Sequence, residues 1–221
     1  MTHVDTIEYK GHNINIWRDE YFGTGNPFDE LDMVSGLVVT NEDGKHLSNV
    51  DMKQFDLYAE YAGGYTYSDG VHEDRLIEAD EVAEFIRKKF KAEVREFITH
   101  GYSQSDWLKG MLIIPYERLV AEFGTTKAGR LKPTARKKAQ QCIEGELEIF
   151  SAWAWGDIYG FEVEGAIDAG YWDGAVGGFY GTDFEKSGLL ETAREVIDYI
   201  VEEEEALQAE VDEMMMIEIG A

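Results

Sequence analysis

The sequence predicts an α+β protein: small antiparallel sheets packed with amphipathic helices, and a long acidic helix at the C-terminus. Two patterns carry this prediction. Short segments in which apolar and polar residues alternate stand near both ends of the chain, and this period of two is typical of strands. Longer segments carry apolar residues every three or four positions, and that period is typical of helices.

The first third of the chain predicts strands joined by turns. Residues 4–18 alternate around Gly11 and indicate a hairpin of two strands, and the apolar residues 33–40 indicate a strand that stops at 41–44. This stop has the sequence Asn-Glu-Asp-Gly, whose residues tolerate the backbone angles of turns. The tyrosine-rich residues 52–67 indicate a further hairpin.

Two helices and a strand are predicted in the middle of the chain. Residues 80–98 repeat apolar side chains at steps of three and four, which predicts one continuous helix. Residues 107–114 are mostly apolar and predict a buried strand. The proline at position 115 suits the first turn of a short helix, and Gly124 suits its end.

The C-terminal part predicts two helices separated by two strands. Residues 133–150 form a helix that begins at a proline, strands follow at 158–163 and 176–180, and the last helix covers about 187–216. Residues 153–181 gather eight aromatic side chains among glycines and acids. We expect this segment to be a packed centre that positions the flanking helices.

A basic loop predicts an internal boundary. Residues 125–133 combine lysine and arginine with glycine and proline, a composition typical of connecting segments. The sequence therefore predicts an N-terminal α+β region over 1–126, a basic loop over 127–133, and a C-terminal α+β region over 134–221 that ends in the acidic helix. One continuous domain is the alternative.

The formal net charge of −25 is unevenly distributed. Residues 1–126 hold 24 acidic and 12 basic residues, residues 127–138 hold 6 basic and none acidic, and residues 139–221 hold 21 acidic and 2 basic. Such a surface repels nucleic acid and anionic membranes and attracts basic proteins at a rate that salt suppresses. Adaptation to high salt, or solubility alone, is the alternative reason for the acids.

Composition excludes several other classes of protein. No apolar run approaches the roughly 20 residues that span a bilayer, and the N-terminus lacks a signal pattern, so we expect a cytoplasmic protein. Cys142 is the only cysteine, and the histidines lack the spacing of metal ligands. No nucleophile or phosphate-binding motif stands in its required context. We therefore expect no cofactor, no metal and no enzyme activity.

Several fragments carry a resemblance to a known family. They are NPFDELDMVSGLVV at 26–39, GYSQSDW at 101–107, MLIIPYERLVAEFG at 111–124, and GELEIFSAWAWGDIYGFEVE at 145–164 followed by GGFYG at 177–181. In this order they resemble a diverse family of phage- and plasmid-borne accessory proteins of unknown function, over about residues 14–200. The GD-[IV]-YGF and GFYG motifs are the most specific part.

The chain departs from that family's pattern in two places. Ser105 stands where a glycine is common, and the Cys-Trp that often precedes GFYG is missing. The family has no established enzyme activity. The resemblance therefore implies a setting among mobile elements in a host-cell cytoplasm, without a mechanism.

Charge and setting together predict a counter-defence protein. We expect an acidic inhibitor that occupies the basic, nucleic-acid-binding surface of a host nuclease, restriction or CRISPR component, with no direct contact to nucleic acid or membrane. Mimicry of DNA is one way in which such an inhibitor would bind. Carboxylates one helical turn apart repeat at roughly 6 Å, which lets an acidic helix line a basic groove. The predicted contact residues are acids of the last helix: Glu191, Glu195, Asp198, Glu202, Glu203, Glu204, Glu205, Glu210, Asp212 and Glu213.

Other interpretations stay open. One is a non-mimic interaction or oligomerisation module that docks through the aromatic, glycine-rich segment, with Tyr171 and Trp172 as contact residues. A nucleotide-handling enzyme is less favoured. The last helix also carries a heptad seam that Glu204 interrupts, so it either packs on its own core or pairs with a second copy in a homodimer. The apolar seam residues are Leu190, Ala193, Ile197, Ile200, Leu207, Val211 and Met214.

Overall fold

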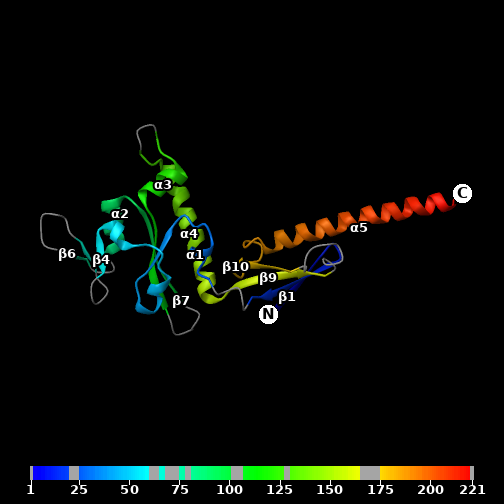
Figure 1. Cartoon of the computed structure of the whole chain (residues 1–221), viewed down its shortest axis with the longest axis horizontal. Coiled ribbons are helices and arrows are strands. Elements are labelled where there is room, and N and C mark those ends of the chain that lie inside the picture. Colours follow the sequence, from blue (N-terminus) through cyan, green and yellow to red (C-terminus); the bar gives the residue numbers. More distant parts are fainter. Residues whose placement is uncertain are drawn as a thin grey trace. The chain divides into compact units, whose positions relative to one another are not determined.

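The computed structural model describes the chain at residues 2–19, 25–59, 65–67, 75–77, 81–100, 107–126, 130–164 and 175–219. It has the predicted α+β architecture, with small antiparallel sheets, amphipathic helices and a long C-terminal helix (Figure 1). The chain divides into two compact units. Unit 1 contains residues 1–24 and 156–221, and unit 2 contains residues 25–155.

Unit 1 is a four-stranded antiparallel sheet covered by one helix. Its strands are β1 (Thr2–Tyr9), β2 (His12–Arg18), β9 (Ile158–Val163) and β10 (Ala175–Tyr180), in the order β1-β2-β9-β10. Helix α5 (Leu189–Ile219) packs on β9 and closes the core. The core contains Ile14, Ile16, Tyr159, Phe161 and Val163 from the sheet and Leu189, Leu190, Ala193, Val196, Ile197 and Ile200 from the helix.

The hairpin predicted around Gly11 is confirmed. Strands β1 and β2 pair from Tyr9↔His12 outward, and Lys10 and Gly11 between them have φ angles of 49° and 83°. Two successive residues with positive φ match the right-handed twist of a hairpin, which explains a glycine at this turn.

Unit 2 is built around a three-stranded antiparallel sheet with helices on both faces. The strands β3 (Gly36–Val39), β8 (Trp107–Ile114) and β7 (Glu93–His100) lie in the order β3-β8-β7. Helix α4 (Pro133–Trp155) covers one face and helix α2 (Val82–Phe90) the other. The central strand β8 is therefore buried on both faces, which explains its continuous apolar run.

Strand β8 contributes side chains to two cores of unit 2. Leu112 and Ile114 of β8 face the core under α4, whereas Met111 and Ile113 face the core under α2, as strand alternation requires. The remaining elements are α1 (Pro27–Glu30), the 3₁₀ helices η1 (Glu42–Leu47) and η2 (Met52–Phe55), the three-stranded sheet of β4 (Leu57–Ala59), β5 (Tyr65–Tyr67) and β6 (Arg75–Ile77), and α3 (Tyr116–Phe123).

The helix predicted over 80–98 is wrong in its second half. Helix α2 ends at Phe90, Lys91 takes a left-handed conformation with φ of 57°, and β7 begins at Glu93. Strand β7 pairs with β8 along its whole length. Val94 of β7 lies in the core under α2, and Phe97 lies in the core under α4. Residues three apart on a strand point to opposite faces, and because both faces of β7 contact a core, its apolar residues show the same three-residue spacing as a helix.

The compact units do not divide at the predicted basic loop. Thr125 and Leu131 form a β-bridge, and the amide of Thr126 donates to the carbonyl of Arg130, which closes the loop on itself. Helix α4 then returns to the core of unit 2 through Ala139 and Phe150. The observed divisions fall at 24/25 and 155/156, because strands from both ends of the chain share the sheet of unit 1.

The packed centre expected at 153–181 is shared by two cores. Trp153 belongs to α4 and stacks on Phe150 in unit 2, at 5.6 Å between ring centroids. Gly156, with φ of 70°, then ends the helix and leads into β9. Tyr159 and Phe161 on β9 pack in unit 1. The described residues Trp153, Tyr159 and Phe161 therefore belong to two separate cores.

Candidate functional site

Helix α5 is longer than the core it covers. Its buried positions end at Ile200, which is 1% exposed, and Val201 is half-buried. From Glu202 to Asp212 every side chain is exposed except the half-buried Val211. In Figure 1 the orange-to-red helix continues past the sheet of unit 1 that its first turns cover. We call residues 202–215 the exposed segment of α5.

Most of the predicted contact acids lie on this exposed segment. The carboxylates of Glu202, Glu203, Glu204, Glu205, Glu210 and Asp212 are exposed. The helix also contains Glu213, whose side chain lies outside the described part of the structure. No lysine or arginine follows Arg194 in the sequence. The exposed segment is therefore a helical surface of a single sign of charge.

The other predicted acids lie on the docked half of α5. Glu191 and Glu195 are exposed there. Asp198 is already engaged, because its Oδ1 lies 2.9 Å from Nζ of Lys10 at the β1–β2 turn. The hydrogen bond from Lys10 lowers the pKa of Asp198. Asp198 thus attaches the hairpin to α5. Asp212 accepts a hydrogen bond from Gln208 at 2.7 Å within the exposed segment itself.

The basic residues of unit 1 do not neutralise the exposed segment. The unit contains 22 acidic and 4 basic residues, a formal charge of −18. Arg18 Nη2 lies 2.6 Å from Asp157 Oδ1, and Arg194 Nη2 lies 2.6 Å from Glu185 Oε1. The pKa of Lys10 is raised mainly by its hydrogen bond to Asp198, and Glu205 of the exposed segment adds a minor contribution.

The exposed segment also carries apolar side chains. Leu207 is 63% exposed, Met214 is 60% exposed, and Met215 is exposed as well. Leu207, Val211 and Met214 belong to the predicted seam, whose first half is buried in unit 1 and whose second half is uncovered within this chain. Met215 is not among the predicted seam residues, although its four-residue step from Val211 is a helical signal.

The alternative docking residues cannot be placed. Tyr171 and Trp172 lie outside the described residues, so that interpretation stays a prediction. Among the described aromatic residues that are exposed, Trp155 and Tyr199 already have contacts within the chain.

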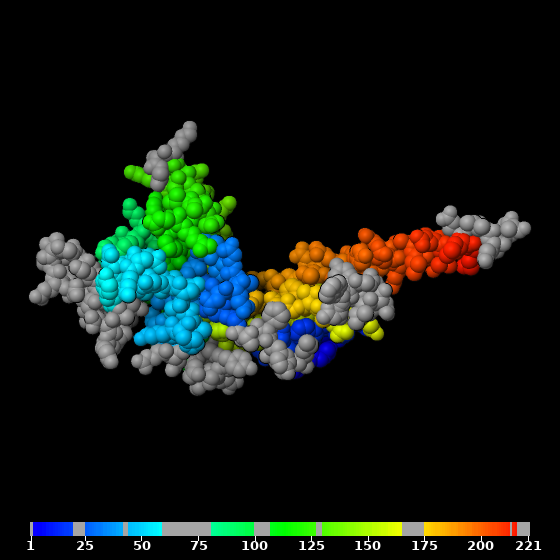
Figure 2. All heavy atoms as spheres, in the orientation of Figure 1, coloured from blue at the N-terminus to red at the C-terminus, as the bar shows by residue number. Residues whose placement is uncertain are grey.

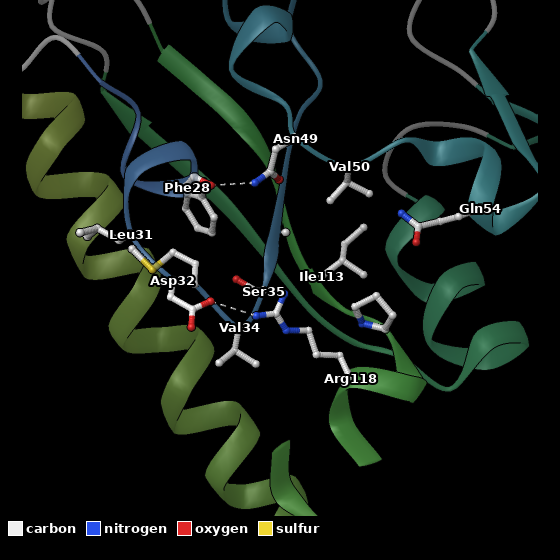
Figure 3. A pocket seen from close by; sticks show the side chains of 13 residues that line it. Phe28, Leu31, Asp32, Val34, Ser35, Asn49, Val50, Gln54, Ile113 and Arg118 are labelled. Carbon is white, nitrogen blue, oxygen red and sulfur yellow. Dashed lines mark hydrogen bonds and ion pairs between the residues drawn. The ribbon is translucent and has the colours of Figure 1, made fainter. Parts of the chain in front are cut away.

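An open pocket of about 360 Å³ lies in unit 2 between α1, β3 and α3 (Figure 3). Several of its polar side chains contact other parts of the protein. Asn49 Nδ2 donates to the carbonyl of Phe28 at 3.1 Å, and Arg118 Nη2 lies 3.5 Å from Asp32 Oδ1. Ser35 is bonded to Glu146. These contacts describe a junction between elements and supply no convergent set of polar groups for a substrate.

Glu146 is a buried carboxylate that the sequence analysis did not identify. It lies on α4, is 6% exposed, and accepts hydrogen bonds from the amides of Val34 at 2.5 Å and Ser35 at 3.0 Å, and from the Ser35 hydroxyl. It therefore fixes the segment before β3 to α4. Among 45 acidic residues, no sequence signal separates this one from its exposed neighbours.

Cys142 is expected to react slowly with thiol reagents. Burial, followed by the nearby Glu146 carboxylate, raises the pKa of its thiol to about 11. Because the thiolate is the reactive form, the rate at pH 8 should be about a hundredfold below that of an exposed cysteine and should rise until about pH 11. DTNB absorbance in native and denaturing buffer measures this, and equal rates in the two buffers would contradict it.

The described residues contain no group of three or more His, Cys, Asp and Glu side chains that could hold a metal ion. No helix in the same part of the chain has a stretch long and apolar enough to cross a membrane.

The two most specific motifs of the resemblance lie at strands of unit 1. GDIYGF forms the start of β9 and GGFYG the end of β10, with Tyr159 paired to Phe179. At Gly160 an added Cβ would lie 2.4 Å from the Trp17 ring and 2.7 Å from the Val176 carbonyl oxygen, so only glycine fits. Most of GYSQSDW lies outside the described residues. Comparisons with protein-family models, curated proteins and solved structures found no match to this chain.

Proposed function

We propose that the protein is an acidic interaction protein that inhibits a host defence component by binding its basic, nucleic-acid-binding surface through the exposed segment of α5. One observation carries the proposal. The helix continues past its core as a surface of exposed carboxylates, with no basic residue after Arg194. The mobile-element setting implied by the family resemblance supplies the defence context.

Physical chemistry supports this use of the segment. Side chains one turn apart on a helix stand about 5–6 Å from one another, so the carboxylates form a regular anionic array. Like-charged neighbours such as Glu202–Glu205 weaken an isolated helix, and a basic partner would relieve that repulsion. Association driven by such an array is fast at low salt and slows as salt rises.

The test is capture of host proteins on the full chain at rising salt, with a charge-matched control. The test variant replaces Glu202, Glu203, Glu204 and Glu205 with glutamine. The control replaces four exposed glutamates of unit 2 with glutamine, which changes the net charge equally: Glu30, Glu81, Glu117 and Glu122.

We expect the wild-type chain and the control to capture a nuclease, restriction or CRISPR component, and the test variant to bind it at least about tenfold more weakly. The captured protein should also lose nucleic-acid binding when the chain is added. Capture of no such component, or equal capture by the two variants, would exclude the proposal.

A further inference from the structure

One face of α5 is buried in its first half and uncovered in its second. Ala193, Ile200, Leu207 and Met214 succeed one another at seven-residue intervals, so they lie on the same face of the helix. Ala193 and Ile200 are buried in unit 1, whereas Leu207 and Met214 are 63% and 60% exposed. In Figure 2 the red end of α5 projects beyond the atoms of the sheet. The apolar face of α5 thus continues beyond the part of unit 1 that covers it.

We propose that this uncovered face binds a basic amphipathic helix of the partner protein. The inference rests on the proposed function and adds the chemical class of the partner's contact surface. Leu207, Val211, Met214 and Met215 would form the apolar centre, and the acids around them would pair with lysine or arginine. The partner surface is then a helix with a narrow apolar stripe between basic residues.

The spacing favours a helix as the occupant. Steps of four and three residues place Leu207, Val211 and Met214 on one stripe, as in the seam between two packed helices, and Met215 widens this stripe on one side. From Leu207 to Met215 the uncovered stripe is about 12 Å long at 1.5 Å per residue. Two methionines give it side chains that adapt to different contours.

Charge excludes a second copy as the preferred occupant. Glu204 occupies a seam position, and Glu203 and Glu210 flank the seam. In a parallel pair each Glu204 would face its counterpart, and in an antiparallel pair the flanking glutamates would face one another. No basic residue of the segment can relieve either contact. Lysine or arginine on a different helix removes the repulsion and replaces it with attraction.

Two synthetic peptides of identical composition test the proposal on the full chain. Both contain the same leucines, lysines and alanines. One arranges leucine at heptad seam positions with lysine beside them, and the other permutes the order so that no apolar stripe forms. We expect fluorescence anisotropy to show the amphipathic peptide binding about tenfold or more tightly than the permuted one.

Matched variants locate the contact. Leu207→Gln combined with Met214→Gln should remove the preference for the amphipathic peptide while leaving the charge unchanged. Ala206→Gln combined with Ala209→Gln alters exposed residues outside the stripe and should keep the preference. Circular dichroism should show equal helix content in both variants.

The outcomes separate this inference from the proposed function. Equal, salt-sensitive binding of both peptides would overturn the helix inference and leave the charge-based function standing. Failure of both peptides to bind would overturn the two together. A wild-type dimer in light scattering that becomes a monomer in the Leu207 and Met214 variant would show that a second copy covers the stripe, which also overturns the inference.

Discussion

Replacing Glu146 with alanine is expected to lower the free energy of unfolding of unit 2 by about 3–5 kcal/mol. The carboxylate accepts hydrogen bonds from two backbone amides, of Val34 and Ser35, and from the Ser35 hydroxyl. Alanine leaves these donors without an acceptor, and a buried donor that loses its partner costs about 1–3 kcal/mol. The segment before β3 would also lose its attachment to α4.

A neighbouring glutamate provides the matched control. Glu144 lies on the same helix, but it is exposed and pairs with Arg95 at 2.7 Å. An exposed ion pair contributes at most about 1 kcal/mol, so Glu144→Ala should have a small effect. Glu146→Gln keeps one acceptor oxygen while placing an amide group against the same donors, and its effect should be intermediate.

Amide hydrogen exchange in the full chain measures this effect within unit 2. The amides of β3 and β8 should lose protection in Glu146→Ala, whereas those of β9 in unit 1 should keep it. Equal protection in the Glu146→Ala and Glu144→Ala variants would show that the buried hydrogen bonds contribute little.

Elements with a local signal were predictable from the sequence. Strand β9 has the predicted bounds, 158–163, and α4 begins at Pro133 as expected. The hairpin at Gly11 also formed as predicted. In each case a proline, a glycine or an alternating run within a few residues determines the structure.

Features that depend on distant contacts were not predictable. The partition into units follows from the pairing of Ile16 with Phe161, and no local pattern indicates a contact over that separation. The same holds for β7, where pairing with β8 prevails over a helix-like period. The basic loop was a reasonable boundary by composition, but α4 after it packs in the same core as the strands before it.

The candidate site was predictable in its charge and not in its geometry. Apart from Glu204, the seam keeps the same spacing from Leu190 to Met214, so the sequence does not show where the sheet stops covering it. The sequence places Asp198 among the predicted contact acids. Its ion pair with Lys10 forms only when the β1–β2 hairpin is folded, so the sequence does not indicate this pair. Only the structure separates the docked half of α5 from the exposed segment.

Replacing Ile200 with alanine is expected to destabilise unit 1 by about 2–5 kcal/mol, whereas Leu207→Ala should change its stability by less than about 0.5 kcal/mol. The two residues are seven positions apart on one face of α5. Ile200 is 1% exposed in the core and Leu207 is 63% exposed. Alanine is the strongest helix former and replaces a residue of lower propensity at both positions, so neither loss of stability comes from helix propensity. The difference in burial then accounts for most of the difference in stability.

Chemical denaturation of the full chain, with amide exchange in β9 to identify unit 1, provides the measurement. Equal destabilisation by Ile200→Ala and Leu207→Ala would contradict the claim that the core of unit 1 ends at Val201. A loss for Leu207→Ala that grows with protein concentration would instead indicate that another copy covers that residue.

This pair of variants also decides how the binding experiments are interpreted. If Leu207→Ala leaves unit 1 as stable as the wild-type chain, then weaker binding of the amphipathic peptide by a Leu207 variant reports recognition and not unfolding. The expected small effect on stability follows from the exposure of Leu207, and the expected large effect on recognition follows from the same exposure. An uncovered apolar residue on a helix contributes little to its own fold and is available to a partner.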